Sequence, residues 1–294
     1  MGWIYFKKNA SKTNFTKTHR IAFFLRSNSN LYETINSIFI SFSFYDLIIP
    51  LENHIKKLNK TKPTILIAPA QVLKLLALNK DLNINPIKII SVAEVLEYDD
   101  KKIIEERFSS KVHQVYQCTE GFLAHTCKDG NLHLNEDIVY IEKYWIDEKS
   151  GRFSPIITDF NRKSQPIIRY KLDDILILEK EPCPCGSVFT RLKTIEGRCD
   201  DILKMKTLEN KEYLLFPDFI RNAIISANAK LDEYIVIKEN NDLNIYLKPL
   251  EAKNEIDKIL LNLYKVHNLK PLNHNYFDYI PEKLDKKRRR VYEI

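Results

Sequence analysis

The stretch PTILIAPAQVLKLLALNKDLNINPIKIIS, residues 63–91, decides the fold class. Its first part, PTILIA (63–68), is a short apolar run that is typical of a buried strand. PAQVLKLLALNKD (69–81) has a proline at its start and apolar residues at helical spacing, which predicts a helix. IKIIS (87–91) repeats the strand pattern. A strand, a helix and a strand in this order predict two parallel strands joined by a helical crossover.

The alternation extends toward the C-terminus. YDDKKIIEERFSS (98–110) predicts a second helix, because acidic residues occupy its first turn, and KVHQVYQ (111–117) predicts a third strand. Beyond residue 130, longer alternating segments predict antiparallel hairpins. These segments are DIVYIEKYWID (137–147), FSPIITDF (153–160) and QPIIRYKLDDILIL (165–178).

A second unit follows IEGRCDD (195–201). It combines helical patterns such as PDFIRNAIISANAK (217–230) with a strand pair, EYIVIKENNDLNIYLKPL (233–250). A unit of about one hundred residues is large enough for a small domain. We therefore expect an α/β protein in which mixed sheets with flanking helices form a large domain, 1–196. A small α+β C-terminal cap domain, 197–294, follows it.

Composition limits the classes of protein that fit. A net charge of +7 favours an anionic partner. The 5 cysteines, an odd number that includes a Cys-x-Cys pair, do not fit a disulfide framework and favour a reducing compartment. The most apolar run, INSIFISFSFYDLIIPL (35–51), is interrupted by serines and Asp46, which predicts strands rather than a membrane span. We expect a cytoplasmic protein with no membrane segment and no signal peptide.

Two pairs of metal-ligating residues stand about fifty residues apart. Cys127 and His133 flank the turn KDGN, while Cys183 and Cys185 flank Pro184. Three thiolates and one imidazole are the ligand set of a closed structural zinc site. In the alternative reading, Cys127 is a small buried apolar residue and His133 an ordinary strand residue. Spacing alone leaves both readings open, because Cys-x-Cys is less usual than Cys-x-x-Cys.

YQCTEG (116–121) directly follows a predicted parallel strand. Open α/β sheets bind ligands at the carboxyl ends of such strands. Tyr116 offers an aromatic face for a base, Thr119 a hydroxyl for a phosphate oxygen, and Glu120 a hard oxygen ligand for Mg²⁺. An ordinary transition from strand to turn explains the same residues.

Three further segments carry chemistry in their residue types. In PIIRYKLDDI (166–175), Arg169 and the two aspartates suit hydrogen bonds to ribose hydroxyls, although an exposed acidic turn is the alternative. EGRCDDILK (196–204) has the character of a hinge between domains. KKRRR (286–290) is either a solvated basic tail, a nucleic-acid patch, or the source of a lysine that neutralises charge on a phosphate.

In order and approximate spacing, YQCTEG, PIIRYKLDDI, PCPCG (182–186), GRCDDILK and a late Lys-x-Arg-Arg resemble the adenylate-forming superfamily. The most similar branch is that of phenylacetate–CoA ligase and the deazaflavin-cofactor synthetases. The resemblance runs from about residue 20 to the C-terminus. It implies that ATP activates a carboxylic acid as an acyl-AMP and that CoA, or another nucleophile, accepts the acyl group. It also implies Mg²⁺ and a structural Zn²⁺, which the branch often holds with Cys and His from two such segments.

The resemblance assigns nucleotide-binding roles to particular residues. Tyr116 stacks on adenine, and the segment SVAEVL (91–96) forms part of the adenine pocket. Asp174 holds the ribose hydroxyls, helped by Arg198. The full set expected at the nucleotide is Tyr116, Ser91, Ala93, Glu94, Asp174, Arg169, Arg198 and Asp200, the last as the hinge residue.

Catalytic and metal-binding roles follow in the same way. Thr119 contacts the α-phosphate, and Glu120 ligates Mg²⁺. Lys287 bridges the α-phosphate and the attacking carboxylate, with Lys286 as the alternative if the register shifts by one. Zinc is expected on Cys127, His133, Cys183 and Cys185.

One feature of the family is missing. The chain has 6 glycines, none of them clustered, and lacks the Gly-rich loop that surrounds the β- and γ-phosphates in relatives. We therefore expect the C-terminal two-thirds of such an enzyme, from a truncated or split gene. An upstream-encoded N-terminal half is then the expected partner, and this chain alone is expected to be slow, because losing one preorganised donor lowers the rate by roughly 10²–10³.

Two other functions compete with the ligase. One is an inactive remnant that still binds a nucleotide. The other is a zinc-containing nucleic-acid-binding protein, which the dispersed basic residues and the lack of a recognised motif disfavour.

Overall fold

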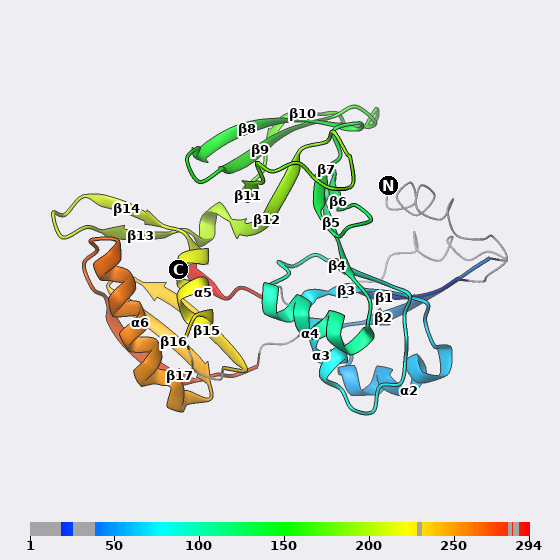
Figure 1. Cartoon of the computed structure of the whole chain (residues 1–294), viewed down its shortest axis with the longest axis horizontal. Coiled ribbons are helices and arrows are strands. Elements are labelled where there is room, and N and C mark those ends of the chain that lie inside the picture. The colour runs from blue at the N-terminus through cyan, green and yellow to red at the C-terminus, as the bar shows by residue number, and fades with distance from the viewer. Residues whose placement is uncertain (1–18, 26–38, 228–230, 282–283, 285–287) are drawn as a thin grey trace.

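The computed structural model describes residues 19–25, 39–227, 231–281, 284 and 288–294. A 12-stranded sheet runs through the larger part of the chain, and a 4-stranded sheet forms the core of the C-terminal part (Figure 1). The predicted fold class, α/β with a smaller α+β unit at the C-terminal side, is confirmed.

One half of the large sheet is parallel. Its strands lie in the order β5-β4-β3-β1-β2, and each neighbouring pair is parallel. The predicted strand, helix and strand of residues 63–91 are present as β3, α3 and β4. The elements of this half are β1 (His19–Leu25), β2 (Ile40–Asp46), α2 (Leu51–Thr61), β3 (Ile65–Pro69), α3 (Ala70–Leu78), β4 (Lys88–Val92), α4 (Tyr98–Phe108) and β5 (Val112–Cys118).

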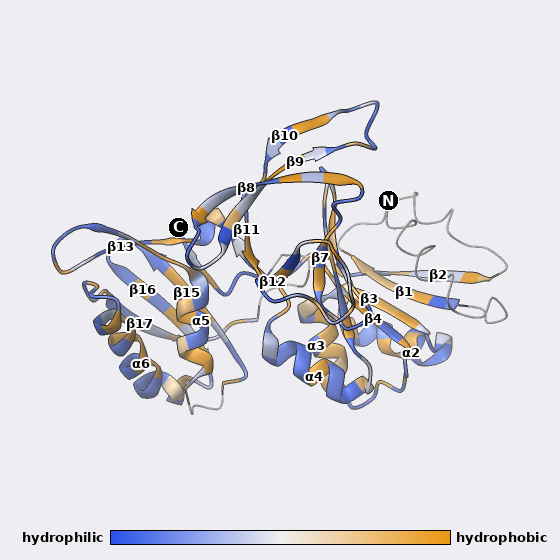
Figure 2. Cartoon of the chain, turned by 45° about the horizontal axis from the view of Figure 1, so that its top comes forward, coloured by the Kyte–Doolittle hydropathy of each residue, from blue (hydrophilic) through white to orange (hydrophobic). Residues whose placement is uncertain are grey.

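The described helices of this half cover one face of the sheet. Leu58, Leu73 and Ile104, one from each helix, pack in one buried cluster with Leu66 of β3 and Ile89 of β4. Figure 2 shows β1 and β3 as mainly hydrophobic, whereas α2, α3 and α4 mix hydrophilic and hydrophobic residues. That mixture is expected of helices that bury one side only.

The other half of the sheet is antiparallel and begins where β6 returns along β5. The strand order from there is β6-β7-β12-β11-β9-β10, and β8 also pairs with β9. The predicted hairpins beyond residue 130 are therefore present. The strands are β6 (Gly121–Thr126), β7 (Leu132–Leu134), β8 (Val139–Asp147), β9 (Arg152–Asp159), β10 (Ile167–Lys171), β11 (Asp174–Leu178) and β12 (Arg191–Arg198).

The C-terminal part, which we call the cap, has its own core. Its sheet has the order β17-β16-β15-β18, and α5 and α6 contribute Ile220, Ile256 and Leu260 to the buried cluster. The elements are the 3₁₀ helix η2 (Cys199–Asp201), β13 (Leu203–Lys206), β14 (Glu212–Leu215), α5 (Pro217–Ile225), β15 (Glu233–Glu239), β16 (Asp242–Lys248), the 3₁₀ helix η3 (Leu250–Ala252), α6 (Lys253–Val266), β17 (Asn273–Asp278) and β18 (Val291–Glu293).

The buried clusters of the large part end at Leu192, and that of the cap begins at Leu203. The predicted boundary between 196 and 197 falls within this interval and stays a prediction. None of the helices in the described part of the chain combines the length and apolar character that a membrane span requires.

Candidate active site and metal centre

Tyr116 and Asp174 meet where the two halves of the large sheet join. The Tyr116 hydroxyl, near the end of β5, donates a hydrogen bond of 2.5 Å to Asp174 Oδ2 at the start of β11. Burial, together with the neighbouring Asp174 carboxylate, raises the pKa of Tyr116 far above its usual range. The phenol is therefore a neutral donor that fixes the orientation of the carboxylate. Because the Tyr116 side chain is only 8% exposed, its predicted stacking on adenine stays a prediction.

Charged side chains surround Asp174. In the β11–β12 pair, Asp174 lies opposite Arg198. Arg198 Nη2 lies 3.0 Å from Asp200 Oδ2 and 3.8 Å from Asp173 Oδ2, with the guanidinium about half exposed. Asp174, Arg198 and Asp200, which the sequence assigned to the ribose and the hinge, are thus brought together.

The segment 91–96 lies next to the strand that carries Tyr116. Ser91 of β4 pairs with Gln114 of β5, and the buried Ser91 hydroxyl has no hydrogen-bond partner among the described residues. Ala93 has a φ of 65°, a conformation that turns the chain sharply after the strand. Glu94 accepts hydrogen bonds from the Gln71 amide at 3.2 Å and the Arg288 amide at 3.4 Å.

Thr119 and Glu120 form the turn between β5 and β6. Thr119 is exposed and Glu120 partly so, and Arg162 donates a hydrogen bond to the Thr119 carbonyl. Their side chains are therefore open to solvent beside the Tyr116 strand. Their predicted contacts with phosphate and Mg²⁺ stay predictions.

Two other assigned positions stand apart. Arg169 lies on β10, separated from β11 by β9, and its guanidinium donates two hydrogen bonds to Glu142, at 2.9 and 3.1 Å. The structure therefore does not bring Arg169 to Asp174. Lys286 and Lys287 lie outside the described residues.

The four residues proposed as metal ligands converge. Cys127, His133, Cys183 and Cys185 offer ligand atoms that all lie within 4.8 Å of one another. Cys127 Sγ is 3.8 Å from Cys183 Sγ, and Cys185 Sγ is 3.6 Å from His133 Nε2. The β6–β7 turn and the loop between β11 and β12 bring the two pairs together, because β12 pairs with β7 beside His133.

The surroundings of the cluster suit a metal. His133 Nδ1 lies 3.1 Å from the Phe189 carbonyl, which can only accept, so Nδ1 carries the proton and Nε2 presents its lone pair to the thiols. Burial raises the pKa of Cys183. Hydrogen bonds from the Cys185 backbone and from the Cys185 and Asn131 side chains act against burial, so the pKa of Cys183 is lower than its ordinary value. The donor set, distances and tautomer all fit tetrahedral zinc.

Comparison with known proteins identifies the fold. No protein-family model matches the chain. Protein CapK of Staphylococcus aureus is 28% identical over 218 residues, which are 68% of this chain and 48% of CapK. A 2-hydroxyisobutyryl-CoA ligase with R3-HIB-AMP bound matches with a TM-score of 0.70 at 16% identity, covering 95% of this chain and 66% of that one. The chain has the fold of the adenylate-forming enzymes. A benzoate CoA ligase from Burkholderia xenovorans LB400 matches with a TM-score of 0.61 at 13% identity, covering 98% of this chain and 64% of that one.

The arrangement of the two parts also has a counterpart within the adenylate-forming fold. Against the same 2-hydroxyisobutyryl-CoA ligase, the TM-score is 0.70 for the postadenylation state, 0.59 for an open conformation and 0.51 for the thioesterification state. Of these three states of that ligase, the postadenylation state has the highest TM-score with this chain. The match to this chain covers about half of the length of CapK and less than two thirds of the length of the benzoate ligase.

Sequence reasoning missed the arginines that follow Lys287. The side chains of Arg288 and Arg290 are 5% and 7% exposed, each bonded to acids of the chain. The interpretation of KKRRR as a solvated tail or nucleic-acid patch is therefore wrong for these two residues. A basic run gives no signal of burial, because its partners come from distant segments: Asp100 lies 188 positions before Arg288, and Glu233 belongs to another strand of the cap.

Proposed function

We propose that this chain is an adenylate-forming ligase that binds ATP and a carboxylic acid and produces an acyl-AMP. The Tyr116–Asp174 hydrogen bond carries the proposal. It fixes a carboxylate opposite Arg198, and the strand of Tyr116 pairs with the strand that leads into the segment 91–94. Solved structures with this fold hold acyl-AMP. Asp174 would accept hydrogen bonds from vicinal ribose hydroxyls, and Ser91, with its unpaired hydroxyl, would offer a further polar contact in the pocket.

The chemistry follows from what each group can hold. A carboxylate oxygen attacks the α-phosphorus, and the bond from that phosphorus to pyrophosphate breaks. The Thr119 hydroxyl would hydrogen-bond an α-phosphate oxygen, and Lys287 would neutralise the charge that develops there. Mg²⁺, for which Glu120 would be one oxygen ligand, supplies Lewis-acid stabilisation of phosphate charge when bound.

We also propose three more specific features of this ligase. They are the phenylacetate–CoA ligase branch, CoA as the acyl acceptor, and zinc on the Cys–His cluster as a structural staple. The similar ligases act with carboxylic acids, AMP adducts and CoA, which supports this substrate class. The activity of a whole enzyme, with any upstream-encoded half, is likewise a proposal for a chain that spans part of its relatives' length.

Calorimetry with AMP and GMP tests the nucleotide site. We expect AMP to bind more tightly than GMP and Asp174→Ala to weaken AMP binding by ~10–100-fold, because hydrogen bonds to a charged group contribute about 1.5–3 kcal/mol. Asp147→Ala, which removes a partly exposed carboxylate from the end of β8, serves as the matched control and should bind AMP normally. Equal affinity for the two nucleotides, or AMP binding that Asp174→Ala leaves intact, would count against the site.

A further inference from the structure

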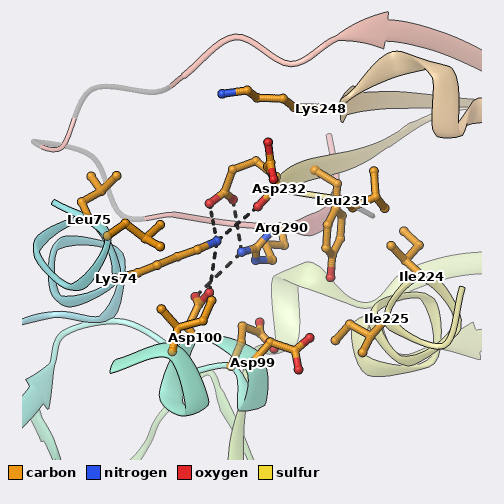
Figure 3. Close-up of a pocket in the computed structure, with 15 residues that line it drawn as sticks. Lys74, Leu75, Asp99, Asp100, Ile224, Ile225, Leu231, Asp232, Lys248 and Arg290 are labelled. Carbon is orange, nitrogen blue, oxygen red and sulfur yellow. Dashed lines mark hydrogen bonds and ion pairs between the residues drawn. The ribbon is translucent and has the colours of Figure 1, made fainter. Parts of the chain in front are cut away.

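Five charged side chains, four of them buried and one partly buried, connect the cap to the large part of the chain. Lys74 of α3, Asp100 of α4, Arg288 and Arg290 are at most 9% exposed, and Glu233 of β15 is 21% exposed. Figure 3 shows Lys74, Asp100 and Arg290 converging at one end of a cavity. We call Lys74, Asp100, Glu233, Arg288 and Arg290 the interdomain cluster.

Asp100 is the centre of the interdomain cluster. Its carboxylate lies 3.3 Å from Lys74 Nζ and 3.8 Å from Arg290 Nη2, and it accepts a hydrogen bond from Arg288 Nη2. Burial raises the pKa of Asp100, but Arg288, Arg290 and Lys74 together outweigh it, so the pKa is lower than its ordinary value. The carboxylate is therefore charged and binds all three cations of the cluster.

These contacts cross the boundary between the two parts. Lys74 and Asp100 belong to the helices that cover the parallel half, whereas Glu233 and Arg290 belong to or adjoin strands of the cap sheet. Lys74 Nζ lies 2.6 Å from Glu233 Oε1, and Arg290 Nη2 lies 3.2 Å from Glu233 Oε2. Glu233 of the cap and Asp100 of the large part thus pair with the same two cations, Lys74 and Arg290.

Apolar packing beside the interdomain cluster is incomplete. A cavity of about 500 Å³ separates Leu75 and Ile103 of the large part from Ile224, Ile225 and Leu231 of the cap. Apolar side chains of both parts therefore line this cavity. Polar interfaces of this kind between domains leave relative motion as the default, so the ionic contacts decide how firmly the cap is held.

We infer that Asp100 is a positioning residue that holds the cap in its observed orientation on the large part, through Arg288, Arg290 and Lys74. Without the carboxylate, the three cations keep only Glu233 and, beside Arg288, Glu94 as acidic neighbours. An excess of positive charge then stays buried, which is strongly unfavourable. The docked population should then fall on the order of 10²-fold relative to undocked arrangements. Only a catalytic consequence of the docked cap rests on the proposed function.

Small-angle X-ray scattering of the full chain tests the inference. Wild-type scattering should fit the observed arrangement, and Asp100→Asn should raise the radius of gyration while far-UV circular dichroism stays unchanged. Asp99→Asn is the matched control, because Asp99 is the preceding residue of α4 and is exposed. It should scatter like the wild type. Asp100→Asn with wild-type scattering, or wild-type scattering that does not fit the docked arrangement, overturns the inference.

Glu233→Gln gives an independent measurement from the cap side, which also decides the matter if Asp100→Asn does not fold. It should raise the radius of gyration in the same direction, and an unchanged profile counts against the interdomain cluster. AMP calorimetry separates the two proposals. Tyr116 and Asp174 lie outside the cluster, so Asp100→Asn should still bind AMP if the nucleotide site is right. Loss of AMP binding in the wild type would reject the nucleotide site and leave the scattering result valid.

Discussion

At the scale of single residues, the proposed nucleotide site depends on a carboxylate whose position is fixed before any ligand arrives. The Tyr116 hydroxyl holds Asp174 Oδ2, and the raised pKa of Tyr116 keeps that hydroxyl protonated throughout the physiological range. A side chain held by a neutral donor keeps its full charge for a ligand. It also loses less conformational freedom on binding, which favours affinity.

The Cys–His cluster gives the first prediction at this scale. Protein purified without added metal should contain close to one zinc per chain by elemental analysis. Cys185→Ser should lose the metal and lower Tm, on the order of 10 °C for a loss of a few kcal/mol, because a structural site contributes directly to folding.

Cys199→Ser is the control for this prediction, since Cys199 lies in η2 and is not among the four clustered residues. It should retain both zinc and Tm. Well-folded wild-type protein without metal would contradict the zinc site.

At the scale of elements, strands and helices with a clear period could be predicted, and those defined by distant partners could not. The α3 segment carries its own helical pattern, and β3 is a continuous apolar run with turn residues on both sides. In contrast, α2 was missed, because its first residue, Leu51, ends an apolar run that predicted strands. β17 has the polar sequence NHNYFD, and β18 has only three residues, so their pairing with β16 and β15 defines them.

The junction of β12 and α5 gives a prediction about pH. Glu196 is 2% exposed and shares Arg152 with Asp218: Arg152 Nε donates to Glu196 at 2.8 Å, and Arg152 Nη2 donates to Asp218 at 2.5 Å. Burial first, and then the Asp218 carboxyl, raise the pKa of Glu196 from 4.5 to about 7. When the folded state raises the pKa of a carboxyl group, that group contributes to the free energy of unfolding. The contribution is complete below the unfolded-state pKa and is lost as the pH rises through the folded-state pKa.

The free energy of unfolding should therefore fall between about pH 4.5 and pH 7 in the wild type through Glu196. In Glu196→Gln, this part of the pH dependence should be absent. The difference between the two proteins should change by up to a few kcal/mol between pH 5 and pH 8, measured by urea unfolding. Glu212→Gln, an exposed change on β14, should keep the wild-type profile. Parallel profiles for Glu196→Gln and the wild type would show that this carboxyl does not titrate as described.

At the scale of the whole molecule, residues between β17 and β18 connect the cap to the parallel half of the large sheet. Leu284 packs against the core of the parallel half, and the Arg288 amide bonds to Glu94 before β18 re-enters the cap sheet. The sequence motifs predicted that the four Cys and His residues cluster and that Asp174 lies near Arg198, because each motif is local or pairs two local motifs. Zinc binding and the ribose contact stay predictions. The interdomain cluster could not be predicted, because Asp100 and Arg288 are 188 positions apart and only the fold brings them together.

The rate of adenylation is a property of the whole molecule and can be predicted at this scale. Pyrophosphate release should be measured over a panel of aryl and alkyl carboxylic acids, with single-turnover detection of AMP adducts for a slow enzyme. We expect slow adenylation by this chain, and Lys287→Ala should lower it by roughly 10²–10³, the loss typical of one group that stabilises transition-state charge.

Lys286→Ala is the matched control, since it removes the same charge one position earlier. It should stay within a few-fold of the wild type. A larger loss for Lys286→Ala than for Lys287→Ala would move the catalytic register by one residue, and rapid turnover by the chain alone would show that another segment performs the role of the Gly-rich loop.

The position of β18 has a consequence for how the chain is made. Translation delivers the parallel half first, and domains generally fold as they emerge. β15 gains its second neighbour only when residues 291–293 have left the ribosome, and Asp100 gains its arginines only a few residues earlier. Until then the nascent cap exposes the unpaired edge of β15, the kind of edge that pairs with other chains. Maturation of the cap and its docking are therefore one late event, and a ribosome that stalls before residue 288 would hold a folded large part beside an open, aggregation-prone sheet.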